Sequence, residues 1–180
     1  VPGAEVVLVR GNDQRIFTTG PDGAVQVTGV ETGEWILTIA RDGFVVGGGA
    51  GIVVLEAFDQ ALARGARVRA EIIGFGTTSD GFDMVMPEPT GTHAAKCMLG
   101  AIKGSGVSPR EVGAVNTHGT ATLKGDLAEV TAMREVFDGK LPPFSSTKSM
   151  TGHPLGAAGA LEVIFCVGML EHNFIAPSIN

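Results

Sequence analysis

The chain has 180 residues, of which 44% are hydrophobic, and a formal net charge of −6. This length and composition suffice for one ordinary domain, or for a domain and a small module, with a real hydrophobic core. The acidic balance and the absence of any block of Lys or Arg argue against a nucleic-acid partner. The two cysteines, Cys97 and Cys166, do not make a disulfide framework and fit a reducing cytosol, so we expect a cytoplasmic protein.

We expect no targeting segment and no membrane span. The first residues, VPGAEVVLVRGND, lack a basic region followed by an apolar signal core. The longest apolar helix-like stretch, Ala157–Leu170, carries Glu162 and is too short to cross a bilayer.

Residues 1–40 consist of short extended runs separated by turn signals, such as GND at 11–13 and PDG at 21–23. The predicted strands are Glu5–Arg10, Arg15–Thr19, Ala24–Val30 and Glu34–Ala40. Because no helix separates them, they indicate an antiparallel meander or part of a sandwich, with Trp35 in its core.

From residue 42 the pattern changes to strands alternating with helices. The glycine-dense residues 43–51 lead into β-branched Ile52, Val53 and Val54, whereas a dinucleotide-binding loop has the order strand, glycines, helix. We therefore interpret them as the close-packed entry to a buried strand.

The remaining elements follow in chain order. They are a short helix at 59–65, a strand at 68–76, a polar loop at 77–89, a helix at 91–104 capped by Thr92, a helix start at 108–111, a strand at 112–117, an amphipathic helix at 125–137, a strand at 144–147, a buried helix at 154–170 and a last strand from 174. This alternation predicts an α/β fold with a layered sheet.

Two histidines stand where such folds gather ligands. His118 follows the strand at 112–117, and His153 precedes Pro154 at the start of a helix. A helix N-terminus disfavours protonation of an imidazole, and a neutral imidazole can donate a hydrogen bond to a developing oxyanion. Lys148 and the acidic residues Asp126 and Glu129 lie between them in the sequence.

Three motifs carry a resemblance. NTHGTATLKGD, SSTKSMTGHPLGAAGALE and RDGFVVGGGAGIVVLE resemble the second half of a β-ketoacyl-[acyl-carrier-protein] synthase, over residues 41–180. The resemblance implies the C-terminal half of a thiolase-like fold, layered α/β/α. It also implies an acyltransferase of fatty acid biosynthesis, which condenses an acyl thioester with malonyl-acyl carrier protein and releases carbon dioxide. Substrates would arrive on the phosphopantetheine of acyl carrier protein, the intact protein would be a homodimer, and no cofactor is implied beyond a structural monovalent cation.

The resemblance also implies site residues. His118 and His153 would stabilise the enolate and the thioester oxyanion, Lys148 would support them, and Glu129 would be the acidic partner of that lysine. The physical chemistry agrees, because an ammonium keeps nearby imidazoles neutral and a carboxylate fixes the ammonium. The further matches are Thr120 and Thr122 near the phosphopantetheine arm, and Asn116 and Glu162 at the structural cation.

The departures concern the rest of the family's chain. The family nucleophile is a cysteine in the first half, which this sequence lacks, and the family's final segment would follow Asn180. Cys97 and Cys166 fall within apolar helices and are interpreted as core residues. In place of the first half stands the β-rich segment 1–40, which resembles carboxypeptidase-regulatory-like modules. A natural fusion, a recombined gene and an assembly artefact would each produce this arrangement.

The sequence leaves other functions open. A polyketide-type ketosynthase shares these motifs, and a binding module whose function lies in residues 1–40 is a rival from another class. A non-catalytic partner subunit would have no need of both histidines and Lys148. His93 and His172 are interpreted as surface or capping residues, and Asp80 and Asp83 as residues that solvate a loop, which in the family lies near the substrate entrance.

Overall fold

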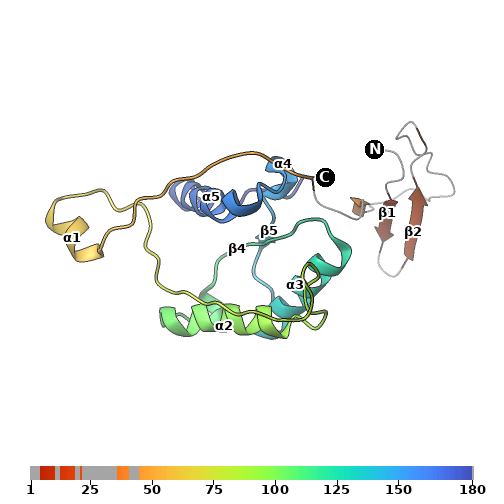
Figure 1. Ribbon diagram of the computed structural model, residues 1–180, viewed down its shortest axis with the longest axis horizontal. Helices are drawn as coiled ribbons and strands as arrows, with labels where there is room; N and C mark the ends of the chain where they lie inside the picture. Colours follow the sequence, from red (N-terminus) through yellow and green to blue (C-terminus); the bar gives the residue numbers. More distant parts are fainter. Residues whose placement is uncertain (1–4, 11–12, 19–20, 22–35, 41–44, 180) are drawn as a thin grey trace.

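The computed structural model describes residues 5–10, 13–18, 21, 36–40 and 45–179 (Figure 1). A small antiparallel sheet near the N-terminus lies at one end of the molecule, and the helices of the later part lie at the other. The predicted boundary between the two parts falls after residue 40, and residues 41–44, which follow it, lie outside the described residues.

The N-terminal sheet has three strands, β1 (Glu5–Arg10), β2 (Asp13–Thr18) and β3 (Ile36–Ala40). β1 is central and pairs antiparallel with both neighbours, so the order is β2-β1-β3 rather than the sequential order of a simple meander. Three predicted strands are thereby confirmed within a few residues. The predicted strand Ala24–Val30 and Trp35 lie outside the described residues.

The rest of the chain is an α/β fold. Its elements are α1 (Phe58–Ala63), α2 (Thr92–Ser105), the 3₁₀ turn η1 (Pro109–Glu111), β4 (Val115–Asn116), α3 (Leu123–Val136), β5 (Phe144–Ser145), α4 (Lys148–Thr151), the 3₁₀ turn η2 (Leu155–Ala157) and α5 (Ala158–His172). β4 and β5 form a parallel pair that lies between α5 on one side and α2 and α3 on the other (Figure 1). This is the predicted α/β/α layering, with both strands shorter than predicted.

The core lies where α2 packs on α3. Ala95, Ala132 and Met133 are fully buried there, with Val136 and Phe137 beside them. Small residues at the contact let the two helix backbones approach closely. Along α3, which was predicted to be amphipathic, Met133 and Val136 are buried, whereas Leu127 is 63% exposed.

The predicted cap Thr92 is wrong, because Gly91 is the N-cap residue of α2 and Thr92 is already helical. The preceding loop provides hydrogen-bond acceptors for this end of the helix. The carboxylate of Glu88 accepts from the backbone N–H groups of Thr90 and Thr92. The predicted helix start at Ser108 is confirmed as a capping box: its side chain accepts from Arg110 N–H, and Glu111 accepts from Ser108 N–H.

The predicted buried strand at 52–54 and the predicted strand at 68–76 are instead extended segments outside any sheet. Ile52 and Val54 are each 90% exposed. One side of each segment rests on a helix: a Cβ at Gly51 would lie 3.1 Å from Ala160 of α5, and one at Gly76 would lie 2.0 Å from the Cys97 carbonyl of α2. A buried strand needs covering on both faces and hydrogen bonds along its edges, which the described residues do not supply here.

The predicted last strand from 174 is also wrong as far as residue 179. The backbone there is held by side chains, since Ser178 Oγ accepts from Ser146 N–H and Ser149 Oγ accepts from Ile179 N–H, each at 2.9 Å. These hydroxyl contacts replace the backbone pairing of a sheet.

The predicted buried helix is only partly right, because Ala158 is the single buried residue of α5. The stretch Leu155–His172, with mean hydropathy 1.4, is long and apolar enough to cross a membrane by length and composition alone. The expectation that this stretch is too short is therefore corrected. Core helices of globular proteins meet the same criterion, and α5 carries Glu162, whose carboxylate faces the protein and pairs with Lys148.

Candidate active site

His118 and His153 lie side by side although 35 residues separate them. Their ring centroids are 5.1 Å apart and their planes meet at 87°, an edge-to-face contact. His118 lies just after β4, as predicted, with Thr117 between the strand and the histidine. His153 follows α4 and lies before η2, five residues ahead of α5, so it is not at the N-terminus of the long helix.

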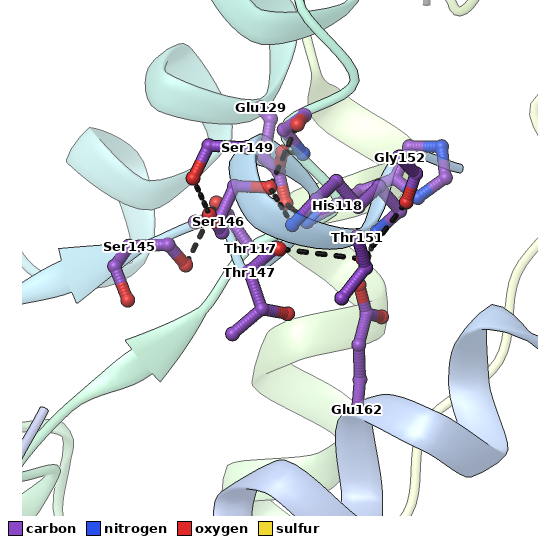
Figure 2. A network of polar contacts seen from close by, with 12 residues as sticks. Thr117, His118, Glu129, Ser145, Ser146, Thr147, Ser149, Thr151, Gly152 and Glu162 are labelled. Atoms are coloured by element: carbon purple, nitrogen blue, oxygen red, sulfur yellow. Dashed lines mark hydrogen bonds and ion pairs between the residues drawn. The ribbon is translucent and has the colours of Figure 1, made fainter. Parts of the chain in front are cut away.

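Glu129 of α3 fixes the turn that presents His118. Its two carboxylate oxygens accept from the backbone N–H groups of His118 at 2.8 Å and Gly119 at 2.9 Å (Figure 2). Ser146 Oγ donates to the Gly119 carbonyl at 2.7 Å. A Cβ at Gly119 would lie 2.6 Å from Ser146 Cβ, and its φ is +33°, so this position requires glycine.

Lys148 pairs with Glu162, not with Glu129 as predicted. The Lys148 side chain is 3% exposed, and its ammonium donates to Oε1 of Glu162, which projects from α5 (Figure 2). A buried ammonium requires a counter-charge, because desolvation disfavours it strongly. Glu129 meanwhile is engaged with the backbone. Glu129 thus contacts the backbone of His118 and Gly119, and its predicted pairing with Lys148 is wrong.

The turn after β5 holds Lys148 in place. Ser145, Ser146, Thr147 and Lys148 are consecutive buried polar residues. The Ser145 carbonyl accepts from the backbone N–H of Thr117 at 2.8 Å and from its hydroxyl at 3.2 Å. This joins the lysine turn to the strand that ends at His118.

The surroundings of His118 favour its neutral form. Desolvation of the ring lowers its pKa from the ordinary value of 6.5, and the positive charge of Lys148 lowers it further. His153 acts in the same direction, whereas the carboxylates of Glu129 and Glu162 oppose the shift. Near neutral pH, His118 is therefore an uncharged imidazole that can donate one N–H hydrogen bond.

Both histidines line an open cleft of about 640 Å³. Thr120 and Thr122, the predicted substrate-binding residues, line it as well, with their hydroxyl oxygens 3.2 Å apart. Residues of the loop 80–88 and of the start of α2 also line the cleft.

Two acidic residues shape that loop rather than merely solvate it. Asp80 accepts from the backbone N–H groups of Phe82 and Glu88, and Asp83 accepts from those of Val85 and Met86. These bonds lower the pKa of both carboxyls, so both remain ionised acceptors.

The prediction for His93 was incomplete, because this residue lines the cleft from the start of α2. Its helix was found from apolar spacing, but nothing local in the sequence shows which residues face a cleft built by a distant loop. Ser146 and Ser178 were missed for the same reason.

The two predicted cation ligands, Asn116 and Glu162, have different surroundings. Both polar side-chain atoms of Asn116 are buried, which suits a ligand. Glu162 already balances the charge of Lys148, so a cation there would compete with the ammonium. No cluster of three or more His, Cys, Asp or Glu side chains suited to a metal ion occurs in the described part of the chain. The cation site stays a prediction.

Neither cysteine is placed as a nucleophile. Cys97 lies within α2 and donates to the Gly76 carbonyl at 3.1 Å. Cys166 lies within α5, where burial raises the pKa of its thiol. Neither lines the cleft. A thiolate nucleophile needs a lowered pKa and access to substrate, which these positions do not provide.

Known proteins resemble this chain closely. Residues 69–180 match the family model "Beta-ketoacyl synthase, C-terminal domain". The chain is 54% identical over 140 residues to 3-oxoacyl-[acyl-carrier-protein] synthase 1 of Escherichia coli (strain K12), which covers 78% of this chain and 33% of that protein.

Solved structures of ketosynthases also resemble this chain. The ishigamide ketosynthase/chain length factor matches with a TM-score of 0.71 and 40% identity, over 76% of this chain and 34% of that one. A second match is the structure of a type II polyketide synthase acyl-carrier protein in complex with its ketosynthase bound to the hexaketide. It has a TM-score of 0.66 and 31% identity, and the match covers 68% of this chain and 31% of that one. The chain thus spans about a third of the length of the relatives it matches. It belongs to the β-ketoacyl synthase family, whose C-terminal domain and thiolase-like fold it carries.

Proposed function

We propose that this chain supplies the oxyanion-stabilising half of a ketosynthase site for the condensation of an acyl thioester with malonyl-acyl carrier protein. The observation that carries the proposal is the pair His118 and His153, in contact at the edge of a cleft. Glu129 fixes the backbone of the first histidine, and burial together with the charge of Lys148 lowers the pKa of its imidazole.

The chemistry requires two oxyanions to be stabilised. Loss of carbon dioxide from the malonyl group leaves an enolate, whose negative charge resides largely on the thioester oxygen. The enolate carbon then attacks the carbonyl of the acyl thioester, the carbon–sulfur bond breaks, and the thiolate leaves. An N–H donor of a neutral histidine can serve each oxygen without first losing a proton.

The acyl group must be carried on a nucleophile that this chain does not contain. Cys97 and Cys166 lie within helices and away from the cleft. We therefore infer that residues 1–180 alone do not condense substrates, and that the reaction requires a nucleophile from outside these residues.

The cleft suits a carrier-bound substrate. The hydroxyls of Thr120 and Thr122 can hydrogen-bond the amides of a phosphopantetheine arm. A related ketosynthase is known in complex with an acyl-carrier protein, which supports acyl carrier protein as the partner. A cytoplasmic homodimer is the matching proposal for the complete enzyme.

The test is an elongation assay with malonyl-acyl carrier protein. The chain is co-expressed with the cysteine-bearing part of a 3-oxoacyl-[acyl-carrier-protein] synthase 1, and product formation is followed. His118→Ala should lower the rate about 100-fold or more, as removal of one oxyanion donor does elsewhere. His172→Ala, at the exposed end of α5, is the matched control. Equal rates for the two variants would refute the proposal.

A polyketide-type ketosynthase remains the second candidate, because a type II polyketide ketosynthase is among the structural relatives. The length of the product formed by the same mixture separates the two. A product extended by a single two-carbon unit favours fatty acid synthesis. A product extended several times without reduction favours the polyketide type.

A further inference from the structure

Lys124, the second residue of α3, connects two segments that line the cleft. Its neighbours Thr122 and Gly125 line the cleft from one segment, and Met86 lines it from the loop of residues 80–88. The Lys124 ammonium nitrogen lies 3.5 Å from the Met86 sulfur. The side chain therefore lies at the rim of the cleft, with its positive charge against the loop.

The Lys124 ammonium has hydrogen-bonding capacity to spare. An ammonium has three N–H donors, and a thioether sulfur is a weak acceptor. Among the described residues, the Met86 sulfur is the one hydrogen-bond acceptor of this ammonium. Because Lys124 is exposed, its remaining N–H groups can reach a ligand at the mouth of the cleft. An anionic oxygen would be a much stronger acceptor than the thioether.

The carboxylate of Asp83 lies near this ammonium but does not occupy it. Asp83 accepts from the backbone N–H groups of Met86 and Val85. These bonds lower the pKa of Asp83 most, and the charge of Lys124 lowers it further. In the described part of the chain, Lys124 forms no direct salt bridge. Its charge is thus available to an anion.

The cleft residues that precede Lys124 recur at every second position. His118, Thr120 and Thr122 line the cleft, and Lys124 follows Thr122 at the same spacing. A phosphopantetheine arm carries its thioester at one end, two amides in the middle and a phosphate at the other end. An imidazole, two hydroxyls and an ammonium suit these groups in that order.

We propose that Lys124 binds the phosphate of the phosphopantetheine arm at the rim of the cleft, and that this contact helps to place the thioester at His118. This inference rests on the proposed function. The phosphate remains distant from the reacting atoms, so Lys124 contributes to binding of the arm rather than to the chemical step. The contact is exposed to solvent, and salt should weaken it.

The experiment titrates the full chain with phosphopantetheine, pantetheine and inorganic phosphate. Calorimetry gives the affinities, and NMR follows the amide signals of Thr120 and Thr122. We expect phosphopantetheine to bind about tenfold more tightly than pantetheine, because a charge-assisted hydrogen bond is added. Lys124→Gln should abolish this preference without changing the affinity for pantetheine, and Lys124→Arg should keep most of it.

Lys103→Gln is the matched control, since Lys103 is an exposed lysine in the last turn of α2 and does not line the cleft. This variant should keep the tenfold preference. Equal affinities of phosphopantetheine and pantetheine for the unmodified chain would overturn the role of Lys124, as would an unchanged preference in Lys124→Gln. Inorganic phosphate that binds as tightly as phosphopantetheine would also overturn it, because the site would then serve free phosphate.

The same titrations separate this proposal from the proposed function. Pantetheine that shifts the amide signals of Thr120 and Thr122, with no preference for the phosphorylated form, refutes only the role of Lys124. If neither pantetheine nor phosphopantetheine binds, the assignment of the cleft to a carrier-bound substrate fails together with the role of Lys124.

Discussion

Lys148 and Glu162 form an ion pair that joins the turn after β5 to α5, next to the two histidines. The lysine side chain is 3% exposed and that of the glutamate 20%. The pair thus places a buried positive charge close to His118, where it disfavours protonation of the imidazole.

Removal of one member of this pair should destabilise the protein strongly. Glu162→Gln leaves a buried ammonium without a counter-charge, and we expect a loss of about 3–5 kcal/mol in the free energy of unfolding. The double variant Lys148→Met with Glu162→Gln should recover most of this loss. Urea denaturation measures both.

The control for that experiment is Glu171→Gln. Glu171 accepts from Arg67 and Arg69, whose side chains are mostly exposed. We expect a change below about 1 kcal/mol. A loss as large as that of Glu162→Gln would show that burial of the ion pair is not the cause.

The same pair should control the titration of His118. Its pKa is lowered in the folded chain, so the unfolded state binds a proton more readily. The contribution of His118 to stability is therefore complete above about pH 6.5 and declines as the pH falls through the lower, folded pKa. Lys148→Met should raise this pKa, and Glu162→Gln should lower it further, in NMR titrations of the imidazole signals. Shifts of the same sign in both variants would contradict the assignment of charges.

Glu129 should act as a positioning residue through the backbone of His118 and Gly119. Glu129→Gln keeps one carbonyl oxygen and loses the second acceptor, while Glu129→Ala loses both. We expect each lost bond to cost about 1–3 kcal/mol, because it leaves an N–H group without its partner. Hydrogen exchange at the two amides should accelerate in the same order.

Glu135→Gln is the matched control, since Glu135 is an exposed residue of the same helix. In the reconstituted enzyme, Glu129→Ala should lower kcat more than it raises KM, because it misplaces an oxyanion donor without removing a substrate contact. An effect on stability alone, with kcat unchanged, would make Glu129 merely structural.

Gly91 should be indispensable for the contact between α2 and α3. Its φ is +69°, and a Cβ would lie 2.4 Å from the Ala128 carbonyl. Gly91→Ala therefore combines an unfavourable backbone conformation with a clash, and we expect a loss of more than about 2 kcal/mol. Gly106→Ala has a similar φ of +73° but open space around it, so it should cost only about 1 kcal/mol. Equal losses in urea denaturation would show that the clash is relieved.

The sequence predicted the parts of this structure that depend on local patterns. Apolar spacing located α2 and α3, and the residues SPRE at 108–111 located a helix start, which the structure forms as a 3₁₀ turn with a capping box. The resemblance to ketosynthases brought His118 and His153 together. These features depend on short-range geometry or on long, specific motifs.

Apart from the cap of α2 and the length of the apolar helical stretch, the failures involve contacts between separate segments. The partner of Lys148 lies 14 residues away on another helix, and two acidic residues were available to it. Residues 52–54 have a β-branched composition typical of a buried strand, but a strand forms only where a neighbour offers its edge.

The most direct test of the central claim is product formation from acyl and malonyl-acyl carrier protein by three samples. The chain alone should form no elongated product. The co-expressed complex with the cysteine-bearing polypeptide should elongate the acyl group by two carbons, and the same complex with His118→Ala should lose about 100-fold or more of that rate. Elongation by the purified chain alone would contradict the account, as would a His118→Ala complex that is as active as the unmodified one.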